Sequence, residues 1–236
     1  MISRRYAKAY IVVSQYRRSV NKIFSEKRLQ HQKFFIKVYN VDIKIRRNIM
    51  EFAERLESER IVLKRPVPSF ELAKEIFAAV EESRENLAPW LPWCQRTTKA
   101  EHSYGFLADW CDKNWQEKTG FPYLIHDKLT DKYLGCIDFM NVSDTNKSGE
   151  IGFWIRTSAQ GHGYIAEALA VLEKEAFNAG IHRIYIGNDP RNTRSANVTK
   201  RAGYILEGIL RQNRWDDYSQ SFVDSNIWSK LKEEYK

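Results

Sequence analysis

The chain has 236 residues, of which 43% are hydrophobic and 13% are aromatic. This apolar content supports a full core for one large domain, so it excludes a wholly disordered protein. The sequence holds no apolar run of about 18 residues, which argues against a membrane-spanning helix, and it has no secretory signal. Three scattered cysteines, Cys94, Cys111 and Cys136, argue against a disulfide framework and structural zinc. We therefore expect a cytoplasmic protein with reduced thiols, no membrane contact and no metal.

The net charge of +8 is unevenly distributed along the chain. Residues 1–49 hold 13 Lys or Arg and only 2 Asp or Glu, a net charge of +11, so the remainder carries −3. This contrast predicts a basic N-terminal extension, 1–49, followed by a mildly acidic folded domain, 50–236.

The extension contains neither Gly nor Pro, and we predict no folded domain for it. Three interpretations stay open. The segment is translated from upstream of the natural start, with Met50 as the true first residue. It is a basic arm that touches RNA or an anionic surface, which is the only basis for a nucleic-acid partner. It is an organelle transit peptide, as its Arg-rich and acid-poor composition suggests.

The first half of the domain predicts strands and two helices. Residues 60–65 alternate apolar and charged side chains and stop at Pro66, as a strand does. Ser69 is placed to cap a helix whose apolar residues recur at helical spacing: Phe70, Ala73, Ile76, Phe77 and Val80. A second helix is predicted over 100–117, after a loop interrupted by Pro89 and Pro92. Strands over 123–126, 133–141 and 150–156 follow in meander order.

The second half predicts alternating helices and strands. A helix over 163–179 ends at Gly180, and a strand over 183–187 follows it. Strand–helix–strand order implies parallel pairing. A short helix over 195–202 leads to two antiparallel strands, 204–207 and 220–228. The fold class is therefore α/β, with a mixed, twisted sheet and helices on both of its faces.

A glycine-rich turn opens the helix predicted over 163–179. It reads Gln160-Gly161-His162-Gly163-Tyr164-Ile165-Ala166. Exposed N–H groups at a helix N-terminus bind anions, and glycine lets phosphate oxygens approach the backbone. The pattern predicts a site for a diphosphate, although paired glycines also occur in plain tight turns.

The same letters match the GxGxxA fingerprint of nicotinamide enzymes, with Asp189 at the end of the next strand. Two observations disfavour that alternative. Residues 157–160 separate the strand from the first glycine. In the dinucleotide fold the first glycine follows the strand almost at once. The chain also ends in antiparallel strands instead of further parallel units.

Several motifs together resemble the GNAT acetyltransferases, specifically the RimJ/RimL type. The main motifs are, in order, Gly149-Glu150-Ile151-Gly152-Phe153-Trp154-Ile155; Gln160-Gly161-His162-Gly163-Tyr164; Asn192-Thr193-Arg194-Ser195; Arg201-Ala202-Gly203-Tyr204; and Glu207-Gly208-Ile209-Leu210-Arg211. The opening strand, 60–65, and Leu91-Pro92-Trp93 also fit, so the resemblance spans about 56–232. Ser158 departs from the pattern, which favours Gln or Arg there. The resemblance implies the GNAT fold and acetyl-CoA as co-substrate.

The resemblance also implies where acetyl-CoA binds, in a gap between the strands predicted over 150–156 and 183–187. Backbone groups near Ile155 and Thr157 would hold the pantetheine arm. The pyrophosphate would contact the amides of Gln160, Gly161, His162, Gly163, Tyr164 and Ile165. Asn192 would contact the pantetheine or thioester end, and the alternative for Asn192 is a helix cap.

The reaction implied is direct attack of a neutral amine on the thioester. Glu150 and Asp138 are the candidate bases, and each has a structural alternative: an exposed strand end for Glu150 and a hydrogen-bonded turn anchor for Asp138. Ser195 would protonate the departing thiolate, and its alternative is a cap for a helix over 196–202. Aromatic candidates for the walls of the acceptor site are Trp90, Trp93, Phe139 and Trp154.

The leading hypothesis for the acceptor is the N-terminal α-amine of a protein, plausibly ribosomal. The first alternative is a small amine, such as a polyamine or an aminoglycoside. An alternative of another class is a CoA-binding regulatory protein without turnover. A homodimer is also expected from the resemblance.

Overall fold

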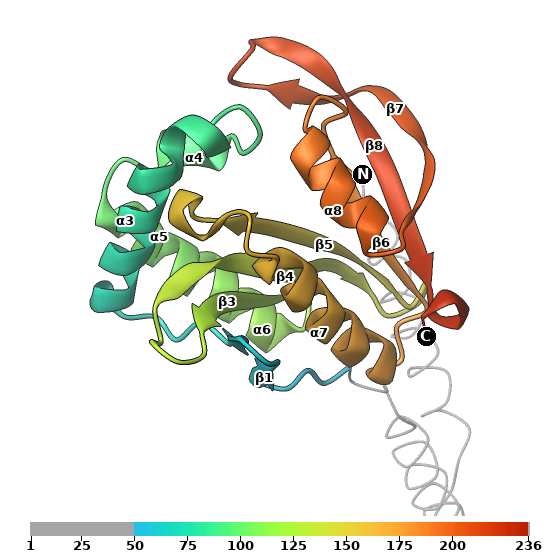
Figure 1. Cartoon of the computed structure of the whole chain (residues 1–236), viewed down its shortest axis with the longest axis horizontal. Coiled ribbons are helices and arrows are strands. Elements are labelled where there is room, and N and C mark those ends of the chain that lie inside the picture. Colours follow the sequence, from blue (N-terminus) through green and yellow to red (C-terminus); the bar gives the residue numbers. More distant parts are fainter. Residues whose placement is uncertain (1–49, 236) are drawn as a thin grey trace, which may run out of the picture. The chain divides into compact units, whose positions relative to one another are not determined.

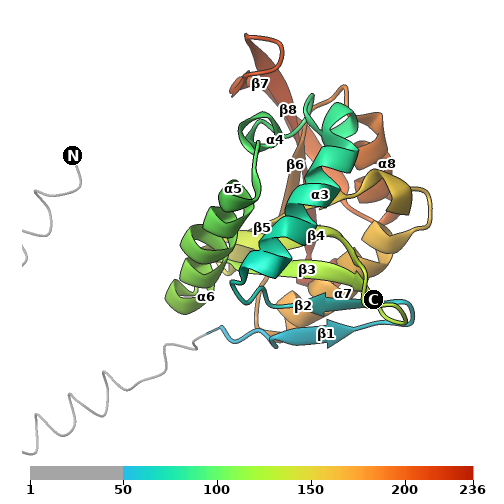
Figure 2. The same ribbon diagram turned by 90° about the vertical axis from the view of Figure 1, so that its left-hand side faces the viewer.

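The computed structural model describes residues 50–235, in which one mixed sheet lies between two layers of helices (Figures 1 and 2). The three interpretations of the basic extension concern residues 1–49 and lie outside this range. Met50 and Phe52 are buried in the core, and the Phe52 ring stacks on Phe121 with centroids 4.0 Å apart. The chain from Met50 onward therefore contributes to the packing of the domain.

The sheet of the described domain has eight strands in the order β1-β2-β3-β4-β5-β6-β8-β7. All neighbours pair antiparallel except β5 and β6, which are parallel. The strands are β1 (Arg55–Glu57), β2 (Ile61–Lys64), β3 (Phe121–Asp127), β4 (Tyr133–Ser143), β5 (Ser148–Ile155), β6 (Arg183–Asn188), β7 (Ile205–Asp216) and β8 (Ser221–Leu231). The mixed sheet confirms the predicted fold class.

Strands β5 and β6 are hydrogen-bonded only at their beginning. Their pairing runs from Ser148 with Arg183 to Glu150 with Tyr185 and then stops. Residues 151–155 of β5 consequently have no partner on the β6 side. This gap in the middle of the sheet is what positions the site.

One face of the sheet is covered by a layer of helices that includes α3 (Phe70–Leu87) (Figure 2). We call it the α3 face. The Ser69 hydroxyl accepts a hydrogen bond from the Leu72 N–H at 3.2 Å, as predicted for a cap. The second predicted helix, 100–117, is present as three consecutive segments. They are α5 (Ala100–Gly105), the π-helix η2 (Phe106–Asp112) and α6 (Lys113–Glu117), and the short α4 (Trp93–Arg96) precedes them.

The opposite face of the sheet is covered by α7 (Tyr164–Asn178) and α8 (Thr193–Arg201) (Figure 1). The predicted apolar side of α7 is buried: Ile165, Leu169, Leu172 and Ala176 all lie in the core. Gly180 adopts a φ of +92° just after the helix, a left-handed conformation that favours glycine. Both helices thus pack on the same side of the gap.

The structure differs from the prediction at β1 and β7. Strand β1 has three residues, too few for a period to be recognised. Strand β7, predicted over 204–207, continues to Asp216. Its distal half, Arg211-Gln212-Asn213-Arg214, is polar because it belongs to an exposed two-stranded ribbon with β8 and buries little on either face.

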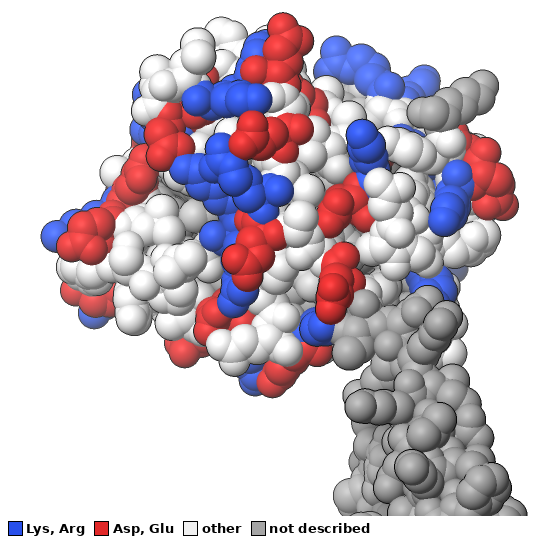
Figure 3. Space-filling model, turned by 90° about the horizontal axis from the view of Figure 1, so that it is seen from below, with Lys and Arg blue, Asp and Glu red and all other residues white. Residues whose placement is uncertain are grey.

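The remaining elements are two 3-10 turns, η3 (Thr157–Ala159) and η4 (Lys232–Glu234). Seen from below, Lys and Arg side chains are interspersed with Asp and Glu on the surface of the described domain (Figure 3). No helix within residues 50–235 has both the length and the apolar character needed to cross a membrane.

Candidate active site

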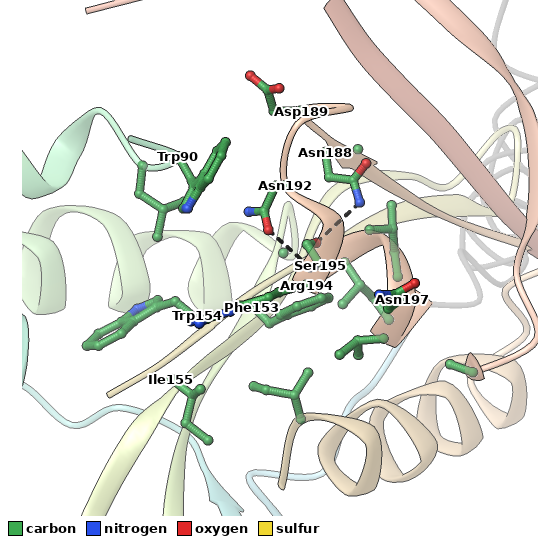
Figure 4. Close-up of a pocket in the computed structure, with 18 of the residues that line it drawn as sticks. Trp90, Phe153, Trp154, Ile155, Asn188, Asp189, Asn192, Arg194, Ser195 and Asn197 are labelled. Atoms are coloured by element: carbon green, nitrogen blue, oxygen red, sulfur yellow. Dashed lines mark hydrogen bonds between the residues drawn. The ribbon is translucent and has the colours of Figure 1, made fainter. Parts of the chain in front are cut away.

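A groove of about 1480 Å³ runs along the gap between β5 and β6 (Figure 4). Its size exceeds the roughly 300–1,000 Å³ of ordinary small-molecule sites, so it suits an elongated ligand together with a second molecule. Residues of α7, α8, β7 and β8 and the loop containing Trp90 contribute to its walls. All the lining residues belong to the described domain.

The side chains of β5 alternate between the two faces of the sheet. Ile151, Phe153 and Ile155 pack in the core cluster that contains α7, whereas Trp154 packs against the cluster that contains α3. Glu150, four positions before Trp154, shares the α3 face. Because the strands part here, the groove gives access to the gap from both faces.

The glycine loop presents free amides at the start of α7. Gly161 and Gly163 have φ angles of +82° and +81°, which strain residues with a Cβ. Helix α7 has no side-chain cap. Within the described chain, the N–H groups of Tyr164, Ile165 and Ala166 have no hydrogen-bond acceptor. This arrangement is suited to hold a phosphate group.

An ion pair fixes the loop from the side of β2. The Arg60 guanidinium donates to the His162 carbonyl oxygen at 3.0 Å and lies 2.7 Å from the Glu167 carboxylate. Glu167 also accepts a hydrogen bond from the Ser58 hydroxyl at 2.6 Å. The first turn of α7 and the backbone of the loop are thereby tied to the same arginine.

Helix α3 holds Thr157, in the segment between β5 and the glycine loop. The Thr157 N–H donates to the Ser83 hydroxyl at 3.0 Å, and the Thr157 hydroxyl accepts from Asn86 at 3.1 Å. The Thr157 N–H is therefore engaged within the protein, and Thr157 does not line the groove, whereas Ile155 does. The His162 side chain also lies outside the groove lining, beside Tyr164.

Asn192 and Ser195 lie at the start of α8, beside the gap (Figure 4). The Asn192 side-chain oxygen accepts from the Ser195 N–H at 3.1 Å, so Asn192 is the helix cap that was one of its two interpretations. Its amide NH₂ has no partner among the described residues and remains available. Ser195 lies inside α8, so the alternative cap of a helix over 196–202 is wrong. The Ser195 hydroxyl accepts from the Asn188 Nδ2 at 3.3 Å.

Glu150 lies where β5 and β6 part, and it lines the groove. Burial raises the pKa of its carboxyl group, and a hydrogen bond from the Asn141 Nδ2, 2.8 Å from Glu150 Oε2, opposes that rise. Such a carboxylate is a stronger proton acceptor than one in water.

Asp138, the second candidate base, does not line the groove. It is opposite Gly152 in the β4–β5 register. Its Oδ1 accepts a hydrogen bond from the Cys136 thiol at 2.9 Å, and burial raises the pKa of Asp138 to about 7. Asp138 therefore lies in the middle of β4 and not in a turn, so the turn anchor considered as its alternative does not apply.

The described residues contain no group of three or more His, Cys, Asp or Glu side chains arranged to hold a metal ion. The model of the acetyltransferase (GNAT) domain matches residues 60–205 of the chain, more than half of it. The chain belongs to the GNAT acetyltransferase family. Enzymes of this family transfer the acetyl group of acetyl-CoA to amines, so membership confirms the predicted reaction class and co-substrate.

Named relatives of this GNAT chain include ribosomal-protein-serine acetyltransferase from Escherichia coli (strain K12). It is 33% identical over 102 residues, which cover 43% of this chain and 56% of that protein, just over half its length. Among solved structures, a RimL ribosomal L7/L12 alpha-N-protein acetyltransferase in complex with coenzyme A has a TM-score of 0.70 at 23% identity, covering 78% of this chain and 100% of that one. RimJ from Mycobacterium smegmatis in complex with CoA-disulfide has a TM-score of 0.67 at 23% identity, covering 79% and 90%. At these identities the two structures show the fold.

Of the four aromatic candidates in this GNAT domain, Trp90 and Trp154 line the groove. Trp93 lies behind Trp154, with ring centroids 5.6 Å apart, and does not line it. Phe139 is wrong as a wall, because it is fully buried in the core on the α7 face. Successive residues of a strand point to opposite faces, and Asp138 points to the α3 face, so Phe139 must point away.

Three residues of the site were not predicted. Tyr185 alternates with two buried isoleucines, which was a signal in the sequence that it faces the opposite side. Arg194 donates to the Gln160 Oε1 at 3.1 Å and connects α8 with the glycine loop, a contact between distant segments that no local pattern announces. Asn188 ends β6 and contacts Ser195.

Proposed function

We propose that this chain transfers the acetyl group of acetyl-CoA to the N-terminal α-amine of a protein, with a ribosomal protein as the acceptor. The observation that carries the proposal is the position of Glu150, a half-buried carboxylate at the parting of β5 and β6. The name of the Escherichia coli relative, ribosomal-protein-serine acetyltransferase, supports this acceptor class. Ribosomal acceptors favour a cytoplasmic site of action.

Acetyl-CoA would lie on the α7 and α8 side of the gap and supplies an acetyl thioester there. The free amides at the start of α7 and the guanidinium of Arg194 would hold the pyrophosphate. The free NH₂ of Asn192, whose oxygen caps α8, is directed at the same groove and would contact the pantetheine. Each of these groups binds the co-substrate without entering the chemistry.

The acceptor amine would approach from the α3 side, between Trp90 and Trp154. An α-amine with a pKa near 8 is already about one-tenth neutral at pH 7, so it needs only a modest base. Glu150, with its raised pKa, would take the proton that the amine loses on attack. A lysine amine, with a pKa of about 10.4, would be neutral about once in several thousand molecules, so the site favours α-amines.

Ser195 would act on the other product, the CoA thiolate. Its hydroxyl lines the groove from α8, on the face opposite Glu150. As the carbon–sulfur bond breaks, the hydroxyl would donate its proton to the sulfur and regain one from water.

A thiol-release assay with acetyl-CoA tests this proposal. The acceptors are peptides that begin with Ser or Ala, the same peptides with a blocked N-terminus and one internal Lys, spermidine and an aminoglycoside. We expect CoA release only with free N-termini. Release with spermidine or the aminoglycoside, but not with the peptides, would replace the proposal with the small-amine alternative.

Two further results are informative. Turnover of the blocked peptides would indicate a lysine acetyltransferase. Binding of acetyl-CoA without turnover of any acceptor would contradict the proposal and favour a regulatory CoA-binding protein.

A further inference from the structure

A partly buried hydrogen-bond network ends at the Ser195 hydroxyl. The Asn188 side chain donates through Nδ2 to Ser195 Oγ at 3.3 Å (Figure 4). On its other side, the Asn188 Oδ1 accepts from Asn226 Nδ2 at 3.0 Å and from the indole Nε1 of Trp228 at 3.4 Å. Asn188 therefore connects β8 with the start of α8.

The partners of Asn188 determine which way its amide faces. An indole N–H can only donate, so the group next to Trp228 has to be the amide oxygen. The Asn226 NH₂ donates to the same oxygen. The NH₂ of Asn188 is then obliged to face Ser195, and the serine oxygen has to accept.

This orientation decides where the proton of Ser195 goes. A hydroxyl group has one hydrogen to donate and lone pairs to accept with. Since Ser195 accepts from Asn188, and no acceptor among the described residues takes its proton, the hydrogen is free to point into the groove. A donor held in this way is oriented before the thiolate forms, which removes an entropic cost from the step.

We propose that Asn188 is a positioning residue that directs the Ser195 proton at the leaving sulfur. The inference rests on the proposed role of Ser195. As the proton moves to sulfur, the Asn188 N–H also stabilises the negative charge that develops on Ser195 Oγ. Asn188 touches neither the thioester nor the amine in this scheme.

The network around Asn188 places polar side chains where little surface is exposed to solvent. Asn226 and Trp228 are only 7% and 8% exposed, and Asn188 pairs with Asn226 across the β6–β8 ladder. Polar groups in such places cost free energy unless they are hydrogen-bonded. A network that holds the Asn188 amide at both its oxygen and its nitrogen, aimed at one hydroxyl in the groove, has the form expected of a supporting shell for that hydroxyl.

A double-mutant cycle tests the inference, with kcat, the KM for acetyl-CoA and thermal unfolding measured for each variant. Asn188→Leu keeps the volume and removes the donor. We expect its kcat to fall about tenfold, the effect of losing one hydrogen bond, with little change in KM. In the Ser195→Ala background the same change should cause no further fall, because the two residues act as a unit.

A second variant separates orientation from packing. Asn188→Asp keeps the acceptor for Asn226 and Trp228 but cannot donate while ionised, so it would capture the Ser195 proton. Its kcat relative to wild type should recover as the pH falls and the carboxyl group becomes a donor. A purely structural role predicts a constant ratio.

The outcomes are distinct. Multiplicative losses in the cycle, or a pH-independent Asn188→Asp defect, would overturn the role of Asn188 and leave that of Ser195 intact. An unchanged kcat in Ser195→Ala would overturn both. Absence of turnover in the wild-type chain would instead contradict the proposed function itself.

Discussion

Glu150 and Ser195 lie on opposite faces of the sheet, at the two sides of the gap between β5 and β6. Glu150 shares the α3 face with Trp154, and Ser195 belongs to α8, which packs on the α7 face. In the proposed reaction one proton leaves the amine and another reaches the sulfur. Placing the two groups on separate faces puts the base on the side from which the amine would approach and the hydroxyl on the side of the CoA sulfur, and the strand gap is what allows both to reach one thioester.

Removing the carboxylate of Glu150 should remove the base. We expect Glu150→Gln to lower kcat on the order of 100-fold with peptide acceptors, as for loss of a general base. Rates are compared after correction for the neutral fraction of the amine. The corrected kcat/KM of the wild type should then rise with pH through the raised pKa of Glu150, above its ordinary value of 4.5, and the variant should show no such rise.

A substitution of Asn141 provides a second test of the pH dependence of kcat/KM. Its hydrogen bond to Glu150 stabilises the ionised carboxylate and lowers its pKa. Asn141→Ala should therefore move the acidic limb to higher pH while it preserves the base. A limb that stays in place in both variants would show that some other group titrates.

Loosening the glycine loop should weaken acetyl-CoA binding more than it slows chemistry. Arg60→Ala removes the contacts to the His162 carbonyl and to Glu167, so the loop has to be ordered when the phosphates bind. We expect the KM for acetyl-CoA to rise about three- to tenfold, with kcat within about twofold of wild type. Steady-state kinetics with saturating peptide measures both.

Arg55→Ala is the control for Arg60→Ala. Arg55 forms an exposed ion pair with Glu57 at 2.7 Å on the neighbouring strand β1, and neither residue lines the groove. Exposed pairs contribute little, so its kinetics should match wild type. An equal rise in KM for both variants would show that general loss of charge, and not the clamp on the loop, matters.

The elements around the glycine loop could be predicted because their signals are local. Gly161 and Gly163 precede a run of apolar residues at helical spacing, and Gly180 ends it, so α7 is specified within its own sequence. The second half of strand β7 has no such signal, since neither face is buried and Arg211 onward reads as a loop. Burial is what produces alternation, and a ribbon without burial shows none.

The part of the site that could be predicted also has a local signal in the sequence. Asn192 and Ser195 stand in a motif of four residues, so one segment of sequence brings them together. The network behind them joins Asn188 to Trp228, 40 positions away, through a strand pairing that no local pattern contains. Phe139 shows the limit of residue type alone, because an aromatic side chain in a strand serves equally as wall or core and only the face decides.

Substitutions of Phe139 and Trp90 should have different effects, the first on the stability of the domain and the second on binding of the acceptor peptide. Phe139 is buried beside Gly149 and Phe52, so Phe139→Leu should lower the free energy of unfolding by about 1–2 kcal/mol without changing the KM for the peptide. Trp90 is half-buried at the groove, so Trp90→Ala should raise the peptide KM severalfold at a smaller cost in stability. Denaturant unfolding and peptide kinetics on the two variants test the pair, and a peptide KM altered by Phe139→Leu alone would restore Phe139 to the acceptor site.

Asp138 should make the domain less stable as the pH rises. Its pKa is raised by burial from 3.8 to about 7, so the folded state binds the proton more tightly than the unfolded state between these values. The stabilisation is complete below about pH 4 and is lost progressively as the pH passes through 7, where a buried charge has to form. Asp138→Asn keeps an acceptor for the Cys136 thiol and removes the ionisation. We expect it to raise the free energy of unfolding by about 1–3 kcal/mol at pH 8 relative to wild type, and by nothing comparable at pH 4. Urea unfolding at the two pH values measures the difference, and a variant destabilised equally at both would show that the carboxylate is ionised and paired in the folded state.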